Sequence, residues 1–236
     1  TSKEQVFFGG KGINVSRVLS ELDIKSVATG FIAGFTGKAL KEEMQKFGIE
    51  TLFTELPDGF SRINIKIKSG EETEINGQGP IVSEEYLEKF LYSLSALKEG
   101  DILVLAGSVP KSVPDNIYEI IMERFSDKGI KFVVDASGEL LKKVLPLKPY
   151  LIKPNHIELG EIFGGDINTP ETAEIYARKL QDMGAENIIV SMAEKGALLL
   201  DENGERHFCK ALEGEVINSV GAGDSMLAGF LAGIER

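Results

Sequence analysis

The chain has 236 residues, and its 26 basic and 37 acidic side chains give it a formal net charge of −11. That charge opposes non-specific binding to nucleic acid and to anionic membranes, so neither is an expected partner. Cys209 is the only cysteine, which excludes an intrachain disulfide. Because no hydrophobic signal segment is found either, the reducing cytoplasm is the expected compartment.

Strand-like apolar runs alternate along the chain with segments of helical periodicity. This order predicts an α/β fold with a largely parallel sheet and helices on both faces, in one domain spanning residues 1–236. In chain order, the predicted strands are Ser26–Ile32, Ile102–Val109, Phe132–Ala136, Tyr150–Ile152 and Asn187–Met192. The predicted helices include Gly37–Phe47, Ser83–Leu97, Pro114–Phe125 and Val220–Ile234.

One stretch departs from this alternation. Ser61–Lys68 alternates polar and apolar residues, and Thr73–Ile75 resumes the pattern after a turn at Ser69–Gly70. This predicts a β-hairpin with one apolar face. It is either a small sheet attached to the main domain, such as a lid, or an ordinary edge hairpin.

A glycine-rich run opens the chain, Phe8-Gly9-Gly10-Lys11-Gly12-Ile13-Asn14, and a helical stripe follows it. Glycines before a helix, with a lysine and an asparagine among them, can hold a polyol or a phosphate. Such turns are also common without any ligand, so the pattern alone is weak.

The run Lys153-Pro154-Asn155-His156-Ile157-Glu158 follows a predicted strand, at the end where open α/β sheets bind ligands. Asn155 and Glu158 share a face of a starting helix and could reach a magnesium–phosphate cluster. The competing interpretation is a capping box, with Asn155 as the N-cap and Glu158 three residues later.

The run Val220-Gly221-Ala222-Gly223-Asp224-Ser225 comes immediately before an apolar helix. Two glycines at a helix start let the backbone approach a ligand and direct unpaired N–H groups toward it, which favours an anion. Asp224 is either a plain N-cap or a base that accepts a hydroxyl proton beside those amides.

The motifs at residues 8–14, 153–158 and 220–225, in this order, resemble those of the ribokinase-like sugar kinases, the PfkB family. The resemblance covers essentially the whole chain. Residues 10–17, 30–37 and 61–64 are most similar to the 1-phosphofructokinase branch. The tagatose-6-phosphate kinases share much of this pattern.

The resemblance implies a three-layer α/β/α domain with a small β-sheet lid formed by about residues 1–10 and 61–76. Members of the family begin with a strand that carries a sugar-binding aspartate and end with a helical segment over the adenine. Neither is expected in this chain.

The resemblance also implies the site residues. Asp224 would be the catalytic base, and the amides of Gly221, Ala222 and Gly223 would stabilise the phosphoryl group. Lys11 and Arg62 would hold the phosphate already present on the sugar. The implied substrate-binding residues are Gly9, Gly10, Lys11, Asn14, Arg62 and Ser108.

On the nucleotide side, Glu158 would order magnesium through water, together with Asn155. The family commonly has Ser-x-Gly where this chain has Ser191-Met192-Ala193, and the methyl group of Ala193 narrows the approach to the nucleotide there. The implied nucleotide-binding residues are Lys153, Asn155, Ser191, Glu194, Gly196, Gly221 and Gly223.

The implied activity is ATP- and Mg²⁺-dependent phosphorylation of fructose-1-phosphate to fructose-1,6-bisphosphate. A homodimer through the lid is expected for a separate reason, because a small sheet with an exposed apolar face tends to be covered. The alternative acceptors are tagatose-6-phosphate and fructose-6-phosphate. A kinase of an unphosphorylated sugar or nucleoside would not need the cations Lys11 and Arg62. A rival of another class is a non-catalytic regulator that binds sugar phosphate or nucleotide on the same fold.

Overall fold

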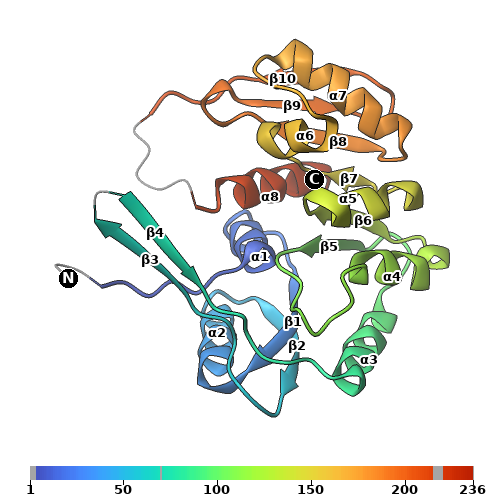
Figure 1. The fold of residues 1–236 in the computed structure, drawn as a ribbon. Coiled ribbons are helices and arrows are strands. Elements are labelled where there is room, and N and C mark those ends of the chain that lie inside the picture. Colours follow the sequence, from blue (N-terminus) through green and yellow to red (C-terminus); the bar gives the residue numbers. More distant parts are fainter. Residues whose placement is uncertain (1–3, 70, 215–219, 236) are drawn as a thin grey trace. The chain divides into compact units, whose positions relative to one another are not determined.

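The computed structural model describes residues 4–69, 71–214 and 220–235 (Figure 1). By its internal contacts the chain forms two compact units, and each is assembled from segments that are distant in sequence. Unit 1 comprises Thr1–Ala96, Ser108–Asp115 and Asp224–Arg236, and unit 2 comprises Leu97–Gly107 and Asn116–Gly223.

Unit 1 is built on a pair of parallel strands, β1 and β2, with helices α1, α2 and α3 beside them. Its core cluster contains Ile13 of α1, Ala28 of β1 and Met44 of α2, all of them buried. The C-terminal helix α8 begins in unit 2 and continues into unit 1 at Asp224. The bounds in this part are α1 Lys11–Glu21, β1 Val27–Ala33, α2 Gly34–Lys46, β2 Glu50–Leu56, α3 Glu84–Ser93 and α8 Ala222–Ile234.

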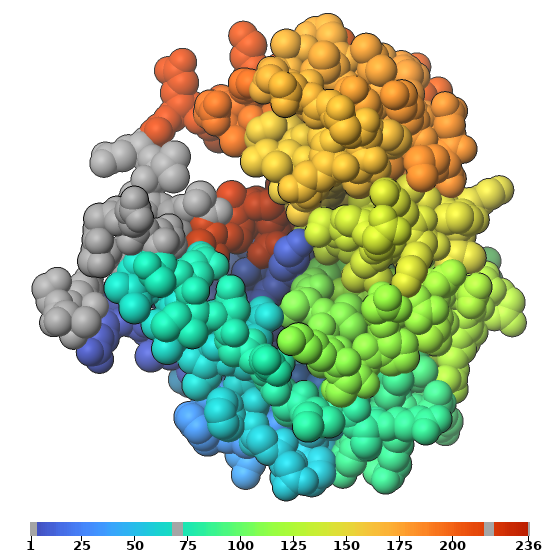
Figure 2. Space-filling view, viewed as in Figure 1, coloured from blue at the N-terminus to red at the C-terminus, as the bar shows by residue number. Residues whose placement is uncertain are grey.

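A two-stranded antiparallel hairpin of β3 Asn64–Ser69 and β4 Glu71–Asn76 completes unit 1. Ile65 lies opposite Ile75 in the register, and both side chains are about half exposed. Lys66 pairs with Glu74. Because side chains alternate between the two faces of a strand, the hairpin has one apolar and one charged face. The predicted hairpin is therefore confirmed (teal in Figures 1 and 2).

Unit 2 contains a six-stranded sheet with the strand order β10-β9-β8-β7-β6-β5. The pairs from β5 to β8 are parallel, whereas β9 and β10 are antiparallel additions at one edge. The central strands are nearly continuous apolar runs, as expected where both faces of a strand are buried. The strands are β5 Ile102–Ala106, β6 Lys131–Asp135, β7 Leu151–Ile152, β8 Asn187–Ser191, β9 Ala197–Leu200 and β10 Arg206–Cys209.

Helices α6 and α7 pack beside β8 and β9 (Figure 1). Thr169 caps the start of α7 and Pro170 occupies its first position, where a missing N–H costs nothing. The apolar stripe Ala173, Ala177 and Leu180 is fully buried. The helices of unit 2 are α4 Ile117–Arg124, α5 Gly138–Val144, α6 His156–Phe163 and α7 Pro170–Asp182.

The α/β class and the mostly parallel sheet were predicted correctly, but some elements differ. The sequence did not indicate β2, β9 or β10. A strand was expected within about residues 1–10, yet residues 4–10 form neither strand nor helix. The predicted strand Ile102–Val109 ends at Ala106, because Gly107 has a φ of +100° that breaks the extended backbone. No helix among the described residues is both long and apolar enough to cross a membrane.

Candidate active site

Asp224 lies in the first turn of α8 with only 7% of its surface exposed. The helix begins at Ala222, so Asp224 is its third residue and not its N-cap. Gly221, immediately before the helix, has a φ of +83°, a conformation that glycine adopts without strain. The sequence Gly-Ala-Gly thus turns the chain into α8 and places a buried carboxylate one turn later.

Asn14 provides the hydrogen bond that this carboxylate needs. Its Nδ2 donates to Asp224 Oδ2 at 2.7 Å. A buried polar group without a partner is costly, so this bond compensates for the burial of the carboxylate and fixes its orientation. A Cβ on Gly9 would lie 3.3 Å from Asn14 Oδ1. The glycine-rich run thus stays close to the Asn14 amide, and two of the predicted motifs lie together within unit 1.

Lys153 is a buried charged residue of unit 2, as Asp224 is of unit 1. It follows β7, is 6% exposed, and its Nζ lies 3.5 Å from Asp135 Oδ1 at the end of β6. A Cβ on Gly223 would lie 3.1 Å from the same Nζ. Gly223 therefore leaves room for a buried ammonium group at the start of α8, where the helix dipole also favours an anion.

Asn155 and Glu158 form the predicted capping box at the start of α6. Asn155 Oδ1 accepts hydrogen bonds from the N–H groups of Ile157 and Glu158, at 2.9 and 2.8 Å. Glu158 Oε2 accepts one from the Asn155 N–H at 2.9 Å. The box occupies one oxygen of Glu158, which leaves Oε1 as the atom that could reach a metal ion through water.

Ser191 lies beside this cap, because Asn155 and Ser191 form an isolated parallel bridge. The turn that follows contains the exposed Glu194 and ends at Gly196, whose φ is +109°. A Cβ on Gly196 would lie 2.0 Å from the Cys209 carbonyl oxygen. Gly196 is thus required for the close approach of β9 to the chain after β10.

The predicted site residues divide between the two units. The sugar-side residues and Asp224 belong to unit 1, and the nucleotide-side residues, including Gly221 and Gly223, belong to unit 2. Within unit 1, Arg62 and Ser108 line one cavity, whereas Gly9, Gly10, Lys11 and Asn14 are not among its lining residues.

Three further residues of this cavity, Asn76, Gln78 and Lys111, were not identified from the sequence. The sequence could have indicated Lys111, because this residue lies in the loop after the predicted strand that became β5. Loops at that end of a parallel strand are where ligands bind.

Asp201, Glu205 and His207 form a group of metal-type side chains in the part of the chain that the structure describes. Asp201 Oδ1 accepts the N–H groups of Asn203 and Glu205, and His207 Nε2 lies 2.9 Å from Asp201 Oδ2. The hydrogen bond from His207 is the main cause that lowers the pKa of Asp201. These bonds organise the turn between β9 and β10, which accounts for the cluster.

Comparison with known proteins gives consistent results. The model of the pfkB family carbohydrate kinases matches residues 2–236. The chain is 50% identical to a 1-phosphofructokinase of Bacillus subtilis over 236 residues, which cover 100% of this chain and 77% of the relative. It is 37% identical to a D-tagatose-1-phosphate kinase of Bacillus licheniformis, over 98% of this chain and 76% of that protein.

Among solved structures, the tetrameric inhibited form of phosphofructokinase-2 from Escherichia coli superimposes with a TM-score of 0.86. The two sequences are 27% identical, and the match covers 96% of this chain and 76% of the other. The fold is therefore the ribokinase-like α/β fold of these kinases.

The bond between Asn14 and Asp224 can be tested by stability. In Asn14→Ala the buried carboxylate loses its donor, which we expect to lower the free energy of unfolding by about 1–3 kcal/mol. Glu21→Ala, at an exposed position on the same helix, should change it by less than about 0.5 kcal/mol. Urea unfolding of both variants measures the difference. Equal losses in the two would contradict a stabilising role for this bond.

Proposed function

Because the chain belongs to the pfkB family of carbohydrate kinases, we propose that it transfers the γ-phosphate of ATP to a hydroxyl of fructose-1-phosphate, giving fructose-1,6-bisphosphate. The observation that carries this proposal is the 50% identity to a 1-phosphofructokinase over the whole chain. Tagatose phosphates are the alternative acceptors, supported by the 37% identity to a tagatose-phosphate kinase. Both acceptors are ketohexose phosphates, so the chemistry is the same.

Asp224 is the base in this proposal. Asn14 donates to Oδ2, which leaves Oδ1 to accept the proton of the attacking hydroxyl. The bond also fixes the orientation of the carboxylate, and fixed geometry is a large part of the catalysis of phosphoryl transfer. Asn14 is then a positioning residue for the base as well as a sugar-binding residue.

The start of α8 binds the phosphoryl group in transfer. The amides of Gly221, Ala222 and Gly223 point to the anion at the positive end of the helix dipole, and Lys153 adds a full charge beside Gly223. Asp135 holds the Lys153 ammonium group in place. Asn155, Ser191, Glu194 and Gly196 complete the nucleotide side of the site.

Magnesium fits the remaining donor set, because a carboxylate oxygen and water are ligands that it prefers. When bound, it neutralises the charge of the ATP phosphates. Glu158 Oε1 would hold water bound to the ion, and the capping box fixes the carboxylate from which that oxygen extends. A kinase that draws on ATP and a phosphosugar acts in the cytoplasm, which we propose as its compartment; cell fractionation tests this.

The hairpin of β3 and β4 forms a homodimer contact in this proposal. Ile65, Ile67 and Ile75 are 49%, 44% and 54% exposed, and such an apolar face on a small sheet favours burial against a partner. A second copy of the chain presents the same face, which permits a symmetric contact. The phosphofructokinase-2 described above has a tetrameric form, which supports assembly in this family.

The role of Asp224 is tested by Asp224→Asn. The asparagine Oδ1 can still accept the hydrogen bond from Asn14, but the side chain cannot take a proton. We expect turnover of fructose-1-phosphate to fall by about 10²–10⁴ while the KM for ATP stays unchanged. Gly229→Ala on the same helix, where an added Cβ meets no atom within 4 Å, is the control. Turnover within a few-fold of the parent, at unchanged thermal stability, would rule out Asp224 as the base.

The role of Glu158 is tested by Glu158→Gln. Glutamine preserves the capping box, so the melting temperature should change little, whereas the loss of charge should raise the Mg²⁺ concentration needed for half-maximal turnover. Asn155→Ala removes the cap and should cost about 0.5–2 kcal/mol of stability. An unchanged magnesium titration with a melting temperature as low as that of Asn155→Ala would mean that Glu158 acts only as a cap.

The dimer is tested by Ile65→Lys, which places a charge in the apolar face of the hairpin. We expect sedimentation velocity to show a dimer for the parent chain and a monomer for this variant, because an unpaired charge in a buried contact is costly. Ile175→Lys, at a position 56% exposed on α7, should leave the dimer intact. A parent chain that is monomeric at micromolar concentration would contradict the proposal.

A further inference from the structure

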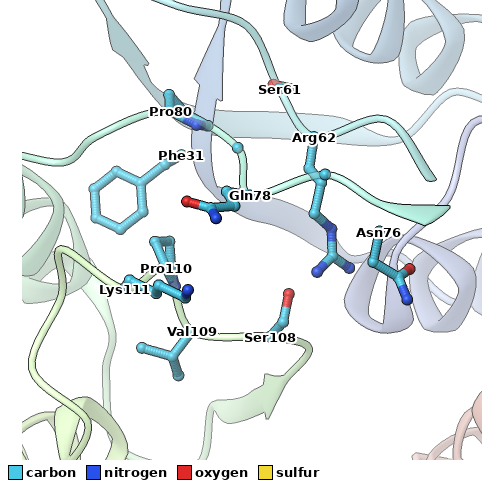
Figure 3. Close-up of a pocket in the computed structure, with 12 residues that line it drawn as sticks. Phe31, Ser61, Arg62, Asn76, Gln78, Pro80, Ser108, Val109, Pro110 and Lys111 are labelled. Carbon is cyan, nitrogen blue, oxygen red and sulfur yellow. The ribbon is translucent and has the colours of Figure 1, made fainter.

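A cavity of about 420 Å³ lies within unit 1. Ligand pockets usually have volumes of about 300–1,000 Å³, so it can hold a sugar phosphate. Arg62 and Gln78 extend toward it from the segments that flank the hairpin, and Ser108 and Lys111 face them from the loop after β5 (Figure 3).

The walls of the cavity are held in place by hydrogen bonds and ring packing. Ser61 exchanges two bonds with the backbone of Ala33, at 2.9 and 3.0 Å. The Val82 N–H donates to Ser112 Oγ at 2.9 Å, which ties the loop after β5 to the chain that follows the hairpin. The Phe31 ring, which lines the cavity, packs on another phenylalanine with a centroid distance of 4.9 Å.

The lining is cationic although the chain is acidic. Arg62 and Lys111 are the two charged side chains among the twelve described residues that line the cavity, and no carboxylate is among them. Neither side chain makes a hydrogen bond or ion pair with any residue that the structure describes. In a chain of net charge −11, two unpaired cations in a lining that contains no carboxylate indicate a site for an anion.

The neutral polar groups of the lining suit the rest of a sugar. Gln78 presents an amide and Ser108 presents a hydroxyl. Such groups can donate to and accept from the hydroxyls of a polyol. Phe31 and Pro110 add an apolar wall (Figure 3). The combination of cations, amides and a ring is that of a phosphorylated sugar site.

We propose that Lys111 and Arg62 together bind the phosphate group of the phosphosugar, with Lys111 in the role that the family resemblance implied for Lys11. This inference rests on the proposed function and deepens it. Lys111 separates phosphorylated from unphosphorylated acceptors, because a neutral sugar gains nothing from a second cation. Arg62 supplies a fork of donors, and Lys111 adds a compact charge from the facing loop.

The test compares Lys111→Gln with Lys25→Gln, which removes the same charge at an exposed position outside the cavity. We expect Lys111→Gln to raise the KM for fructose-1-phosphate about tenfold and to leave the KM for ATP unchanged. Lys111→Arg should restore most of the loss, since it retains the charge. Equal rises in both KM values, or a change no larger than in Lys25→Gln, would overturn the proposal.

A second measurement does not depend on turnover. Isothermal titration calorimetry gives the Kd of fructose-1-phosphate for the parent, Lys111→Gln, Arg62→Gln and the double variant. If both cations hold one phosphate, the two single losses should combine non-additively. Additive losses would place the cations on separate groups and overturn the shared site.

The two experiments also separate this inference from the proposed function. Binding that depends on Lys111, in a chain that turns over no phosphosugar, would support the anion site and contradict the kinase. Turnover that is insensitive to Lys111 would do the opposite. A parent chain that neither binds nor phosphorylates fructose-1-phosphate would contradict both.

Discussion

The hydrogen bond between Asn14 and Asp224 is the interaction on which the site depends. It joins two residues that are 210 positions apart in the chain. Asp224 is buried in the first turn of α8, and a buried carboxylate is tolerated only with a donor. Helix α1 supplies that donor from the end of the glycine-rich run. The requirement of a buried carboxylate for a donor thus ties helix α1 to helix α8.

A similar constraint operates in unit 2. Lys153 is as buried as Asp224, and Asp135 compensates its charge from the neighbouring strand. Asp135 and Lys153 lie at the carboxyl ends of the parallel strands β6 and β7, where the backbone turns away from the sheet. Gly223 has no side chain to displace the ammonium group. Among the described residues, unit 1 thus buries a carboxylate with an amide partner, and unit 2 buries an ammonium group with a carboxylate partner.

The sequence predicted the parallel core and the hairpin well, because their apolar patterns are strong. β2 was not recognised, since Glu50–Leu56 mixes charged and apolar residues on a strand with only one buried position. The capping box was visible from the spacing of Asn155 and Glu158, because it is a local contact. Lys111 belongs to no motif, and its proposed role depends on a loop and on the segments that flank a hairpin, which sequence spacing does not bring together. The bond between Asn14 and Asp224 was not predicted either, because its two residues are 210 positions apart.

The assembly of unit 1 from three chain segments has a consequence for synthesis. Its first 96 residues and the loop Ser108–Asp115 leave the ribosome well before Asp224 does. The residues that line the cavity with Arg62 and Lys111 all belong to those earlier segments, whereas the carboxylate of the proposed base arrives with α8. A nascent chain therefore contains every residue of the cationic cavity before it contains Asp224. Contacts of such long range are the slow ones to form, so we expect the bond between Asn14 and Asp224 to form late in folding.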